Sequence, residues 1–250
     1  MEYKKSEWCG FKMLEFEFDG KGAKLVLPNM PRDDRKWLLK TEYFGAFPNF
    51  ELVMLERGYY VAHVQNITRW CLPEDTARQA AFCEFLHREF GLAKTCMPVG
   101  MSCGGMQAVY LAAKYPHLVA SLYLDAPVLN LLSCPCSVGR ENGGGMYEEF
   151  VRATGRTVST LLNDRNHPID YADKLIENKI PLALICGEAD TVVPYLENGA
   201  VLAEKYRKSG VPFLEIVKPD CDHHPHGLEM QEPLIDFAKQ YYERQGKENE

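Results

Sequence analysis

The sequence predicts an α/β fold, a doubly wound and mostly parallel sheet with helices on both faces. Three observations favour this class. Short β-rich runs alternate with longer helical patterns along most of the 250 residues. The later strand-like runs are continuously apolar, as expected of parallel strands that helices cover on both faces. The length fits one domain with a sizeable core, so we expect a single domain over residues 1–250.

The elements follow one another in a regular order. The runs predicted as strands are residues 23–28, 36–44, 59–65, 95–101, 119–127, 180–190 and 212–219. The runs predicted as helices are residues 48–58, 73–91, 104–116, 194–210 and 233–245. Gly58 and Gly210 are typical helix ends. Because ligands of such sheets bind beyond the carboxyl ends of the strands, residues that directly follow a strand are the candidates for function.

Residues 129–175 interrupt this alternation. They include the run SCPCSVGRENGGGMYEEF, whose three glycines at 143–145 are typical of a turn. Long segments of this kind at the carboxyl edge of a sheet are often functional. We therefore expect a small lid-like insertion within the domain, with a long surface loop carrying one or two helices as the alternative.

Composition excludes several classes of function. The formal net charge of −7 gives no electrostatic support for nucleic-acid binding. No apolar run approaches the about 18 residues that span a bilayer, so we expect no membrane partner. The first 20 residues lack the apolar segment of a signal peptide, which predicts a cytoplasmic protein with its nine cysteines reduced. The sequence carries no signal for an oligomeric state.

Ser102 stands at the centre of the sequence VGMSCGGMQA. A predicted strand runs into it and a predicted helix runs out of it, and Gly100 and Gly104 occupy the positions two before and two after. This G-x-S-x-G pattern between strand and helix is typical of a nucleophile elbow, where the serine side chain projects from a sharp turn. We predict that Ser102 is a nucleophile. The alternative is a structural serine in a glycine-rich loop.

Cys103 is a rival nucleophile, because thiols are intrinsically reactive. The glycine bracket centres on Ser102, however, since the residues two before and two after Cys103 are Met101 and Gly105. We expect Cys103 to contribute its backbone N–H, at the start of the helix, to an oxyanion hole.

A serine nucleophile needs a base, and the base needs an orienting acid. In this strand–turn–helix context the chain order is serine, acid, histidine. Asp190, at the end of the strand run 180–190, is the favoured acid. Asp125, at the end of an earlier strand run, is the backup acid.

The favoured base lies in the run DHHPHG, which follows the last predicted strand. His223 is closest to the strand end and is the first choice, with His226 as the backup and His224 as the third option. A histidine-rich run can also bind metal, with Cys221 and Asp222 as further ligands. Ligands so close in sequence rarely complete a metal site alone, so we expect neither metal nor cofactor.

These three motifs resemble the α/β-hydrolase superfamily over nearly the whole chain: GMSCGG, GEADTVVP and HHPHGL occur in that order. The carboxyl-terminal pattern is similar to a bacterial subgroup of prolyl-oligopeptidase-like and acetyl-esterase hydrolases. The resemblance implies His223 as the base and a small acyl ester, such as an acetyl ester on a carbohydrate, as the substrate.

The sequence departs from that subgroup at two places. Asp222 stands where relatives often have glycine, and we expect it to raise the pKa of the His223 imidazole if the two side chains meet. No His-Gly motif follows the third strand, so the second oxyanion donor is left open among the backbone amides of residues 40–45.

The resulting hypothesis is a serine hydrolase that cleaves a carboxylic ester through an acyl-enzyme. Ser102 is the nucleophile, His223 the general base and Asp190 the orienting acid, and the only expected partner is a small-molecule ester. Two alternatives stay open. One is a peptidase of the prolyl-oligopeptidase type, which normally carries a large additional domain. The other is a non-catalytic ligand-binding module on a hydrolase scaffold.

Overall fold

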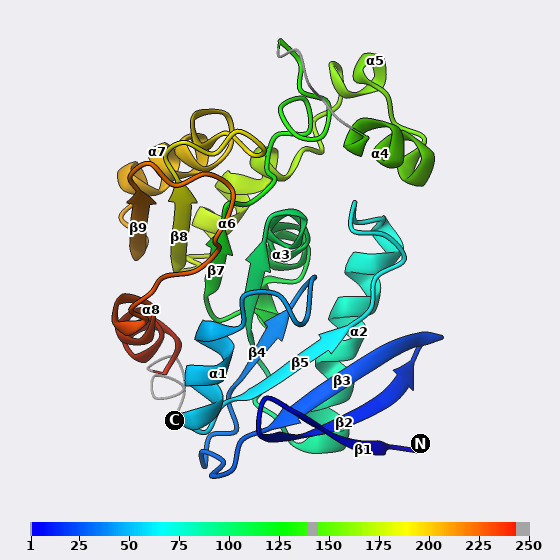
Figure 1. The fold of residues 1–250 in the computed structure, drawn as a ribbon, viewed down its shortest axis with the longest axis vertical. Coiled ribbons are helices and arrows are strands. Elements are labelled where there is room, and N and C mark those ends of the chain that lie inside the picture. Colours follow the sequence, from blue (N-terminus) through cyan, green and yellow to red (C-terminus); the bar gives the residue numbers. More distant parts are fainter. Residues whose placement is uncertain (1, 140–144, 244–250) are drawn as a thin grey trace.

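A computed structural model describes residues 2–139 and 145–243, which contain one nine-stranded sheet (Figure 1). The strands are β1 (Lys4–Trp8), β2 (Phe11–Phe18), β3 (Lys21–Leu27), β4 (Trp37–Lys40), β5 (Tyr60–Val64), β6 (Met97–Met101), β7 (Leu122–Asp125), β8 (Leu182–Gly187) and β9 (Phe213–Lys218). Their spatial order is β1-β2-β3-β5-β4-β6-β7-β8-β9. The pairs up to β3–β5 are antiparallel, and every pair from β5–β4 onward is parallel.

Helices cover both faces of the sheet, as predicted. They are α1 (Asn49–Glu56), α2 (Pro73–Phe90), α3 (Cys103–Lys114), α4 (Met146–Thr154), α5 (Val158–Leu161), α6 (Ala172–Glu177), α7 (Gly199–Ser209) and α8 (Glu232–Phe237). Short 3-10 turns lie at Pro116–Leu118, Pro168–Tyr171 and Tyr195–Glu197, and a π-helical turn at Ala238–Tyr242 continues α8.

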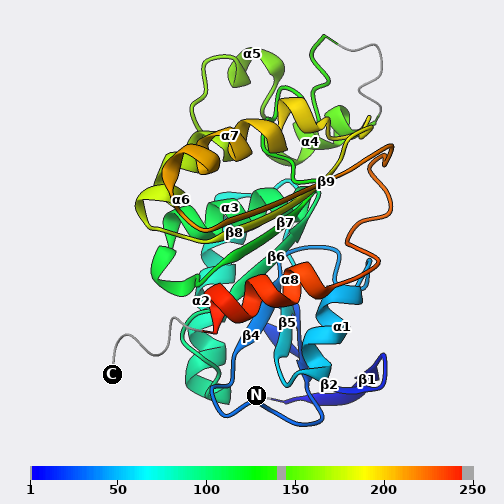
Figure 2. The ribbon, with the colours of Figure 1, turned by 90° about the vertical axis from the view of Figure 1, so that its left-hand side faces the viewer.

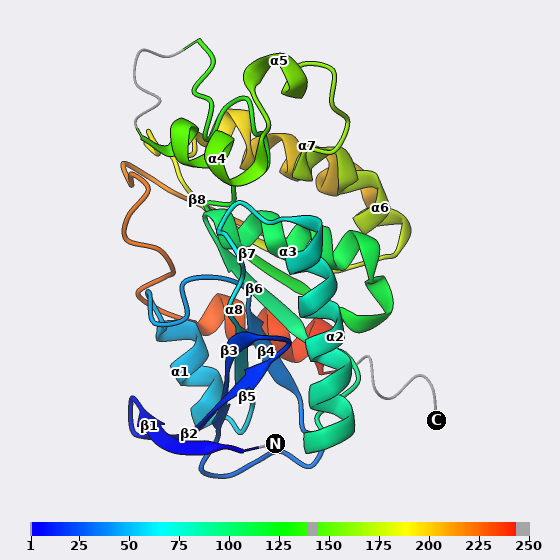
Figure 3. The same ribbon diagram turned by 90° about the vertical axis from the view of Figure 1, so that its right-hand side faces the viewer.

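Two hydrophobic clusters hold these layers together. On one face, Phe50 of α1 and Phe237 of α8 pack against strand residues such as Val99 (Figure 2). On the other face, α2, α3, α6 and α7 pack against strand residues such as Leu39 and Leu124 (Figure 3). The parallel strands are therefore buried on both sides, which explains their continuously apolar sequences.

The structure corrects two of the predicted elements and adds two strands. The strand predicted over residues 36–44 ends at Lys40, because the backbone then turns through Tyr43, whose φ is +53°. The helix predicted from residue 194 begins at Gly199, after a separate 3-10 turn. The antiparallel strands β1 and β2 were not predicted at all.

The segment 129–175 joins β7 to β8 and contains α4, α5, a 3-10 turn and the start of α6. Figure 1 shows α4 and α5 beyond the carboxyl ends of the parallel strands. A third hydrophobic cluster joins them to α3 and to the loops after β5 and β7, with Phe150 of α4 packed near Trp70 and Cys103. The insertion thus lies over the sheet edge where a site is expected. Of its predicted glycine turn, residues 143 and 144 lie outside the described residues.

The remaining expectations concern membrane-spanning helices and the state of the cysteines. Within residues 2–139 and 145–243, no helix is long and apolar enough to cross a membrane. All nine cysteines are free thiols, as expected.

Candidate active site

Ser102 lies on the sharp turn between β6 and α3. Its φ is +52°, in the left-handed region that most residues avoid. Its N–H donates to the carbonyl oxygen of Asp125 at 2.9 Å, and its own carbonyl oxygen accepts the N–H groups of Gly105 and Val128, each at 3.0 Å. The bonds with Asp125 and Val128 fix the strained turn to the neighbouring strand β7 and to the chain beyond it, and the bond from Gly105 closes the first turn of α3.

The glycines around Ser102 are required by close backbone approach. A Cβ on Gly100 would lie 2.5 Å from the carbonyl oxygen of Gly104, which is too close for any side chain. A Cβ on Gly105 would lie 2.4 Å from Cβ of Pro127. Gly104 is less crowded, with 3.0 Å to Oγ1 of Thr41. The elbow therefore needs Gly105, which lies outside the sequence pattern, as well as Gly100, while Gly104 is in a tight but less restricted position.

The three favoured residues come together in one hydrogen-bonded chain. Nε2 of His223 lies 3.1 Å from Oγ of Ser102, and Nδ1 of His223 lies 2.8 Å from Oδ2 of Asp190. Because a carboxylate only accepts hydrogen bonds, Nδ1 carries the proton and Nε2 is free to accept the serine hydroxyl. His223 and Asp190 are 7% and 5% exposed, so little water competes for these contacts. The arrangement matches the geometry of an activated serine.

The loop after β8 holds Asp190 in place. Its Oδ1 accepts the backbone N–H groups of Val192 at 2.9 Å and Val193 at 2.7 Å. With Oδ1 held by the loop, Oδ2 faces the imidazole of His223. A carboxylate with both oxygens occupied has a fixed orientation, which suits the role of aligning a base.

Asp222 does not take the position that the sequence suggested. Its Oδ1 accepts the backbone N–H of His223 and that of Thr191, both at 2.8 Å. These amides hold the pKa of the Asp222 carboxyl below its usual range. Asp222 therefore ties the loop that carries the acid to the loop that carries the base, through the backbone.

The backup acid and the backup base bind each other. Nδ1 of His226 donates to Oδ1 of Asp125 at 2.6 Å. The other oxygen of Asp125, Oδ2, accepts the backbone N–H of Gly227 at 2.6 Å and the hydroxyl of Tyr123 at 2.9 Å. Burial alone would raise the pKa of Asp125, but the hydrogen bond and charge of His226 hold it below its usual range. Asp125 is thus directed at His226 and not at His223.

Cys103 begins helix α3, and its side chain is buried. The first N–H groups of a helix have no acceptor within the helix, so this amide suits the oxyanion-hole role predicted for it. Burial raises the pKa of the Cys103 thiol to about 11. A thiol in this state is a poor nucleophile at neutral pH, which favours Ser102.

The loop expected to supply the second oxyanion donor packs against the elbow. The backbone N–H of Thr41 donates to the carbonyl oxygen of Val99. The Thr41 hydroxyl donates to the carbonyl oxygen of Gly104 at 2.8 Å. The amide of Thr41 is therefore occupied. The choice of second donor stays a prediction, and because Lys40 belongs to strand β4, the amides of residues 42–45 are the ones that the loop itself offers.

A buried network of side-chain amides, which the sequence analysis missed, positions this loop. Nε2 of Gln107 on α3 donates to Glu42 at 2.8 Å, and Nδ2 of Asn66 donates to the carbonyl oxygen of Thr41 at 2.8 Å. Gln79 of α2 donates to Oε1 of Gln107 at 2.9 Å. Three polar residues from three elements thus fix residues 41 and 42 beside Ser102. Asn66 lies in the loop after β5, and the sequence signal of Gln79 and Gln107 was an amide side chain on a predicted helix.

A cavity of about 340 Å³ opens beside Ser102. Its walls include Ser102 and His223 at one end, Tyr43 and Phe47 from the loop after β4, and Cys134 and Met146 from the insertion. Arg69 also lines it and forms a two-point ion pair with Glu149 of α4. The insertion therefore contributes directly to the cavity, and the ion pair fastens α4 to the segment after β5.

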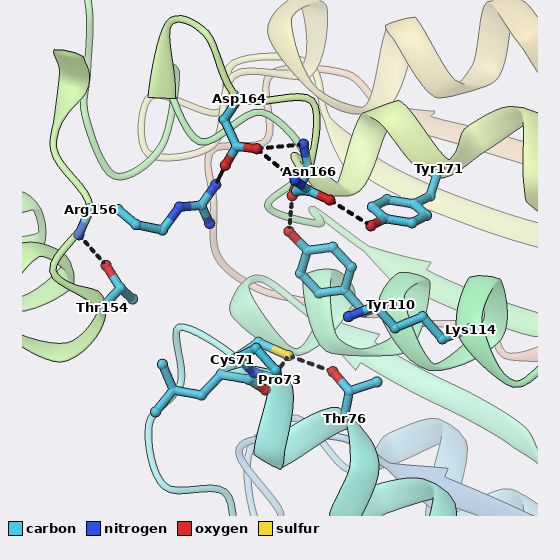
Figure 4. Close-up of a pocket in the computed structure, with 11 residues that line it drawn as sticks. Cys71, Pro73, Thr76, Tyr110, Lys114, Thr154, Arg156, Asp164, Asn166 and Tyr171 are labelled. Atoms are coloured by element: carbon cyan, nitrogen blue, oxygen red, sulfur yellow. Dashed lines mark hydrogen bonds and ion pairs between the residues drawn. The ribbon is translucent and has the colours of Figure 1, made fainter. Parts of the chain in front are cut away.

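A second cavity, of about 380 Å³, lies between α2, α3 and the insertion (Figure 4). Tyr110 donates from its hydroxyl to the carbonyl oxygen of Asn166 at 2.5 Å, and Arg156 pairs with Asp164. Lys114 lies over the ring of Tyr110. None of the three triad candidates lines this cavity, so it is separate from the chemistry proposed for Ser102.

Comparison with known proteins agrees with this architecture. A family model described as alpha/beta hydrolase fold matches residues 63–143, which include the elbow. The chain has the α/β-hydrolase fold. Solved structures with this fold include an esterase of Pyrococcus furiosus, with a TM-score of 0.62 and 15% identity over 96% of this chain and 93% of that one. A search of curated proteins found no match.

Other similar α/β-hydrolase structures are much longer than this chain. A puromycin hydrolase has a TM-score of 0.69 and 19% identity over 95% of this chain, but only 39% of its own chain is covered. For an acylaminoacyl peptidase of Pyrococcus horikoshii, the TM-score is 0.69 and the identity 15%, over 96% of this chain and 42% of that chain. This chain thus spans about two fifths of the length of these two proteins.

Proposed function

We propose that this chain is a serine hydrolase that cleaves a carboxylic ester with a small acyl group. The observation that carries the proposal is the hydrogen-bonded chain from Ser102 through His223 to Asp190. In this chain the serine hydroxyl can donate to His223 and His223 can donate to Asp190, which is the order that nucleophilic catalysis needs. The nucleophile lies at the cavity wall. The esterase, the puromycin hydrolase and the acylaminoacyl peptidase, which share this fold, support a hydrolase as the general class.

In the proposed reaction, Oγ of Ser102 attacks the ester carbonyl carbon while Nε2 of His223 takes the hydroxyl proton. Asp190 stabilises the imidazolium that forms. The tetrahedral intermediate collapses, and His223 gives its proton to the departing alkoxide, which leaves as the alcohol. Water then attacks the acyl-enzyme with His223 again as the base, and this step releases the carboxylic acid and restores Ser102.

The negative charge on the carbonyl oxygen would be stabilised at the start of α3. The backbone N–H of Cys103 is one proposed donor, and an amide among residues 42–45 is the second. The dipole of the 12-residue helix α3 adds to the stabilisation, because its amino terminus carries partial positive charge.

The cavity favours an ester with a small acyl group. Much of its lining is apolar, with Ala46, Met101 and Val192 among its wall residues. A volume of about 340 Å³ would hold an acetyl group together with an alcohol portion. The resemblance to acetyl esterases makes an acetylated carbohydrate the preferred natural substrate.

The test is hydrolysis of p-nitrophenyl acetate by the wild type and by Ser102→Ala. We expect turnover to fall on the order of 10³-fold or more in the variant. Ser121→Ala is a matched control, because Ser121 is buried before β7 and its hydroxyl has no hydrogen-bond partner among the described residues. Equal rates for wild type and Ser102→Ala would exclude Ser102 as the nucleophile.

Peptidase activity is the second candidate, because the acylaminoacyl peptidase shares the fold. A prolyl-peptide substrate cleaved faster than acetyl esters would favour it. Labelling with a fluorophosphonate probe separates both enzymes from a non-catalytic binding module, since only an activated serine reacts. Failure of the intact protein to label would favour the binding module.

A further inference from the structure

Three histidines of the loop after β9 form a compact cluster next to Ser102. The ring centroids lie 4.9 Å apart for His223 and His224, 4.8 Å for His223 and His226, and 5.0 Å for His224 and His226. One nitrogen of each ring can be chosen so that all three lie within 4.8 Å of one another. Neutral imidazole is a good ligand for Zn²⁺ and similar transition metals.

Two of these rings already have the partners that metal-binding histidines normally have. Nδ1 of His223 is bound to Asp190, and Nδ1 of His226 is bound to Asp125. A carboxylate on one nitrogen fixes the tautomer and leaves the lone pair on the other, which is the usual arrangement behind a metal ligand. Nε2 of His223 and Nε2 of His226 are therefore both able to donate a lone pair.

The charges around the cluster suit a dication. Asp125 and Asp190 together carry two negative charges directly behind the rings, which balance a bound M²⁺. Of the nearby cations, Arg69 is paired with Glu149, and Nζ of Lys218 donates to the carbonyl oxygens of residues 225 and 227.

We propose that a transition-metal dication such as Zn²⁺ binds His223, His224 and His226 and holds the hydrolase in an inactive state. The proposal rests on the proposed function. Coordination would occupy the lone pair on Nε2 of His223, so the hydroxyl of Ser102 would lose its proton acceptor. Metal–nitrogen bonds of about 2.05 Å place tetrahedral ligands about 3.3 Å apart, whereas one nitrogen of each ring lies within 4.8 Å of the other two, so these nitrogens must approach by up to about 1.5 Å. His224 is exposed and stacks on Phe47 with ring centroids 5.3 Å apart, so metal binding would turn its ring away from this contact.

The test is a calorimetric titration of ZnCl₂ into the metal-free wild type, Ser102→Ala and His224→Ala. We expect one Zn²⁺ per chain for the wild type and Ser102→Ala, and at least tenfold weaker binding for His224→Ala. Zn²⁺ should also slow p-nitrophenyl acetate hydrolysis, with each rate compared with the metal-free rate of the same variant. A chelator should restore the rate. Higher concentrations of Zn²⁺ should be needed to inhibit His224→Ala.

Cys221→Ser is the matched control, because Cys221 is a free thiol of the same loop. It should bind Zn²⁺ as the wild type does. Unchanged affinity in His224→Ala, or loss of binding in Cys221→Ser, would overturn the three-histidine site. Saturable binding without inhibition would overturn the inactive state. An inactive metal-free wild type would instead count against the proposed function, while the calorimetry still decides whether the histidines bind metal.

Discussion

The carboxylate of Asp125 accepts a hydrogen bond from Nδ1 of His226 at 2.6 Å, while its backbone carbonyl accepts the N–H of Ser102 at 2.9 Å. One residue at the end of β7 therefore holds both the nucleophile turn and the loop that carries His223. The His226–Asp125 pair lies beside the His223–Asp190 pair, with the two rings 4.8 Å apart. The first pair contributes to the position of the loop, and the second contacts the nucleophile.

The two acids are expected to respond differently to the same change. Asp190→Asn removes the charge that orients His223 and favours the wrong tautomer, so kcat should fall by about 10³-fold or more. Asp125→Asn weakens a buried contact away from Oγ of Ser102, so it should lower the free energy of unfolding by about 1–3 kcal/mol and kcat by less than tenfold. Ester kinetics and urea unfolding of both variants measure this. The reverse pattern would make Asp125 the catalytic acid.

Much of the fold could be predicted because the parallel strands are buried on both faces and separated by helices. Strand β2 also carries a sequence signal, since Phe16 and Phe18 alternate with Glu15 and Glu17, but so short an alternation does not by itself establish a strand. The end of β4 could not be predicted. Residues 41–44, TEYF, have no residue that rules out a strand, and contacts of Thr41 with the elbow turn the chain away after Lys40.

The candidate triad could be predicted because each member follows a strand in the expected order. Local sequence could not show which acid meets which histidine, because the loops after β7, β8 and β9 meet only in the folded chain. The same limit applies to Asp222. Its neighbour in sequence is His223, yet its carboxylate bridges two backbone amides from different loops.

Cys103 is expected to be dispensable as a thiol. Burial raises its pKa to about 11, so roughly one thiol in 10³ is ionised at pH 8. Cys103→Ala should keep kcat within about tenfold of the wild type, because only its backbone N–H is assigned a role. Iodoacetamide should modify the exposed Cys9 well before Cys103, and the rate at Cys103 should rise about tenfold per pH unit between pH 8 and 10. Mass spectrometry of the two peptides measures both rates. Fast alkylation of Cys103 at pH 7 with loss of activity would contradict this assignment.

The elbow should tolerate no side chain at Gly100. A Cβ there would lie 2.5 Å from a backbone oxygen, so Gly100→Ala must shift the turn and should lower the free energy of unfolding by about 3 kcal/mol. Gly45→Ala is the control, since Gly45 is exposed and a Cβ there meets nothing within 4 Å. It should change stability by less than about 0.5 kcal/mol. Equal stability of the two variants in urea would show that the turn adapts.

The ion pair between Arg69 and Glu149 should act on substrate binding more than on stability. Both side chains are partly exposed, at 31% and 41%, so their contact should contribute less than about 1 kcal/mol to folding. It nevertheless joins α4, which supplies Met146 to the cavity, to the segment after β5. Glu149→Gln should therefore raise KM for p-nitrophenyl acetate several-fold and leave kcat nearly unchanged.

Glu148→Gln removes the same charge from the same helical turn and serves as the control. It should leave KM unchanged, because Glu148 does not line the cavity beside Ser102. A fall in kcat with constant KM in Glu149→Gln would mean instead that the ion pair influences the reacting groups, through Arg69 at the cavity wall. Equal changes in KM for the two variants would mean that Glu149 acts only through its negative charge and not through its ion pair with Arg69.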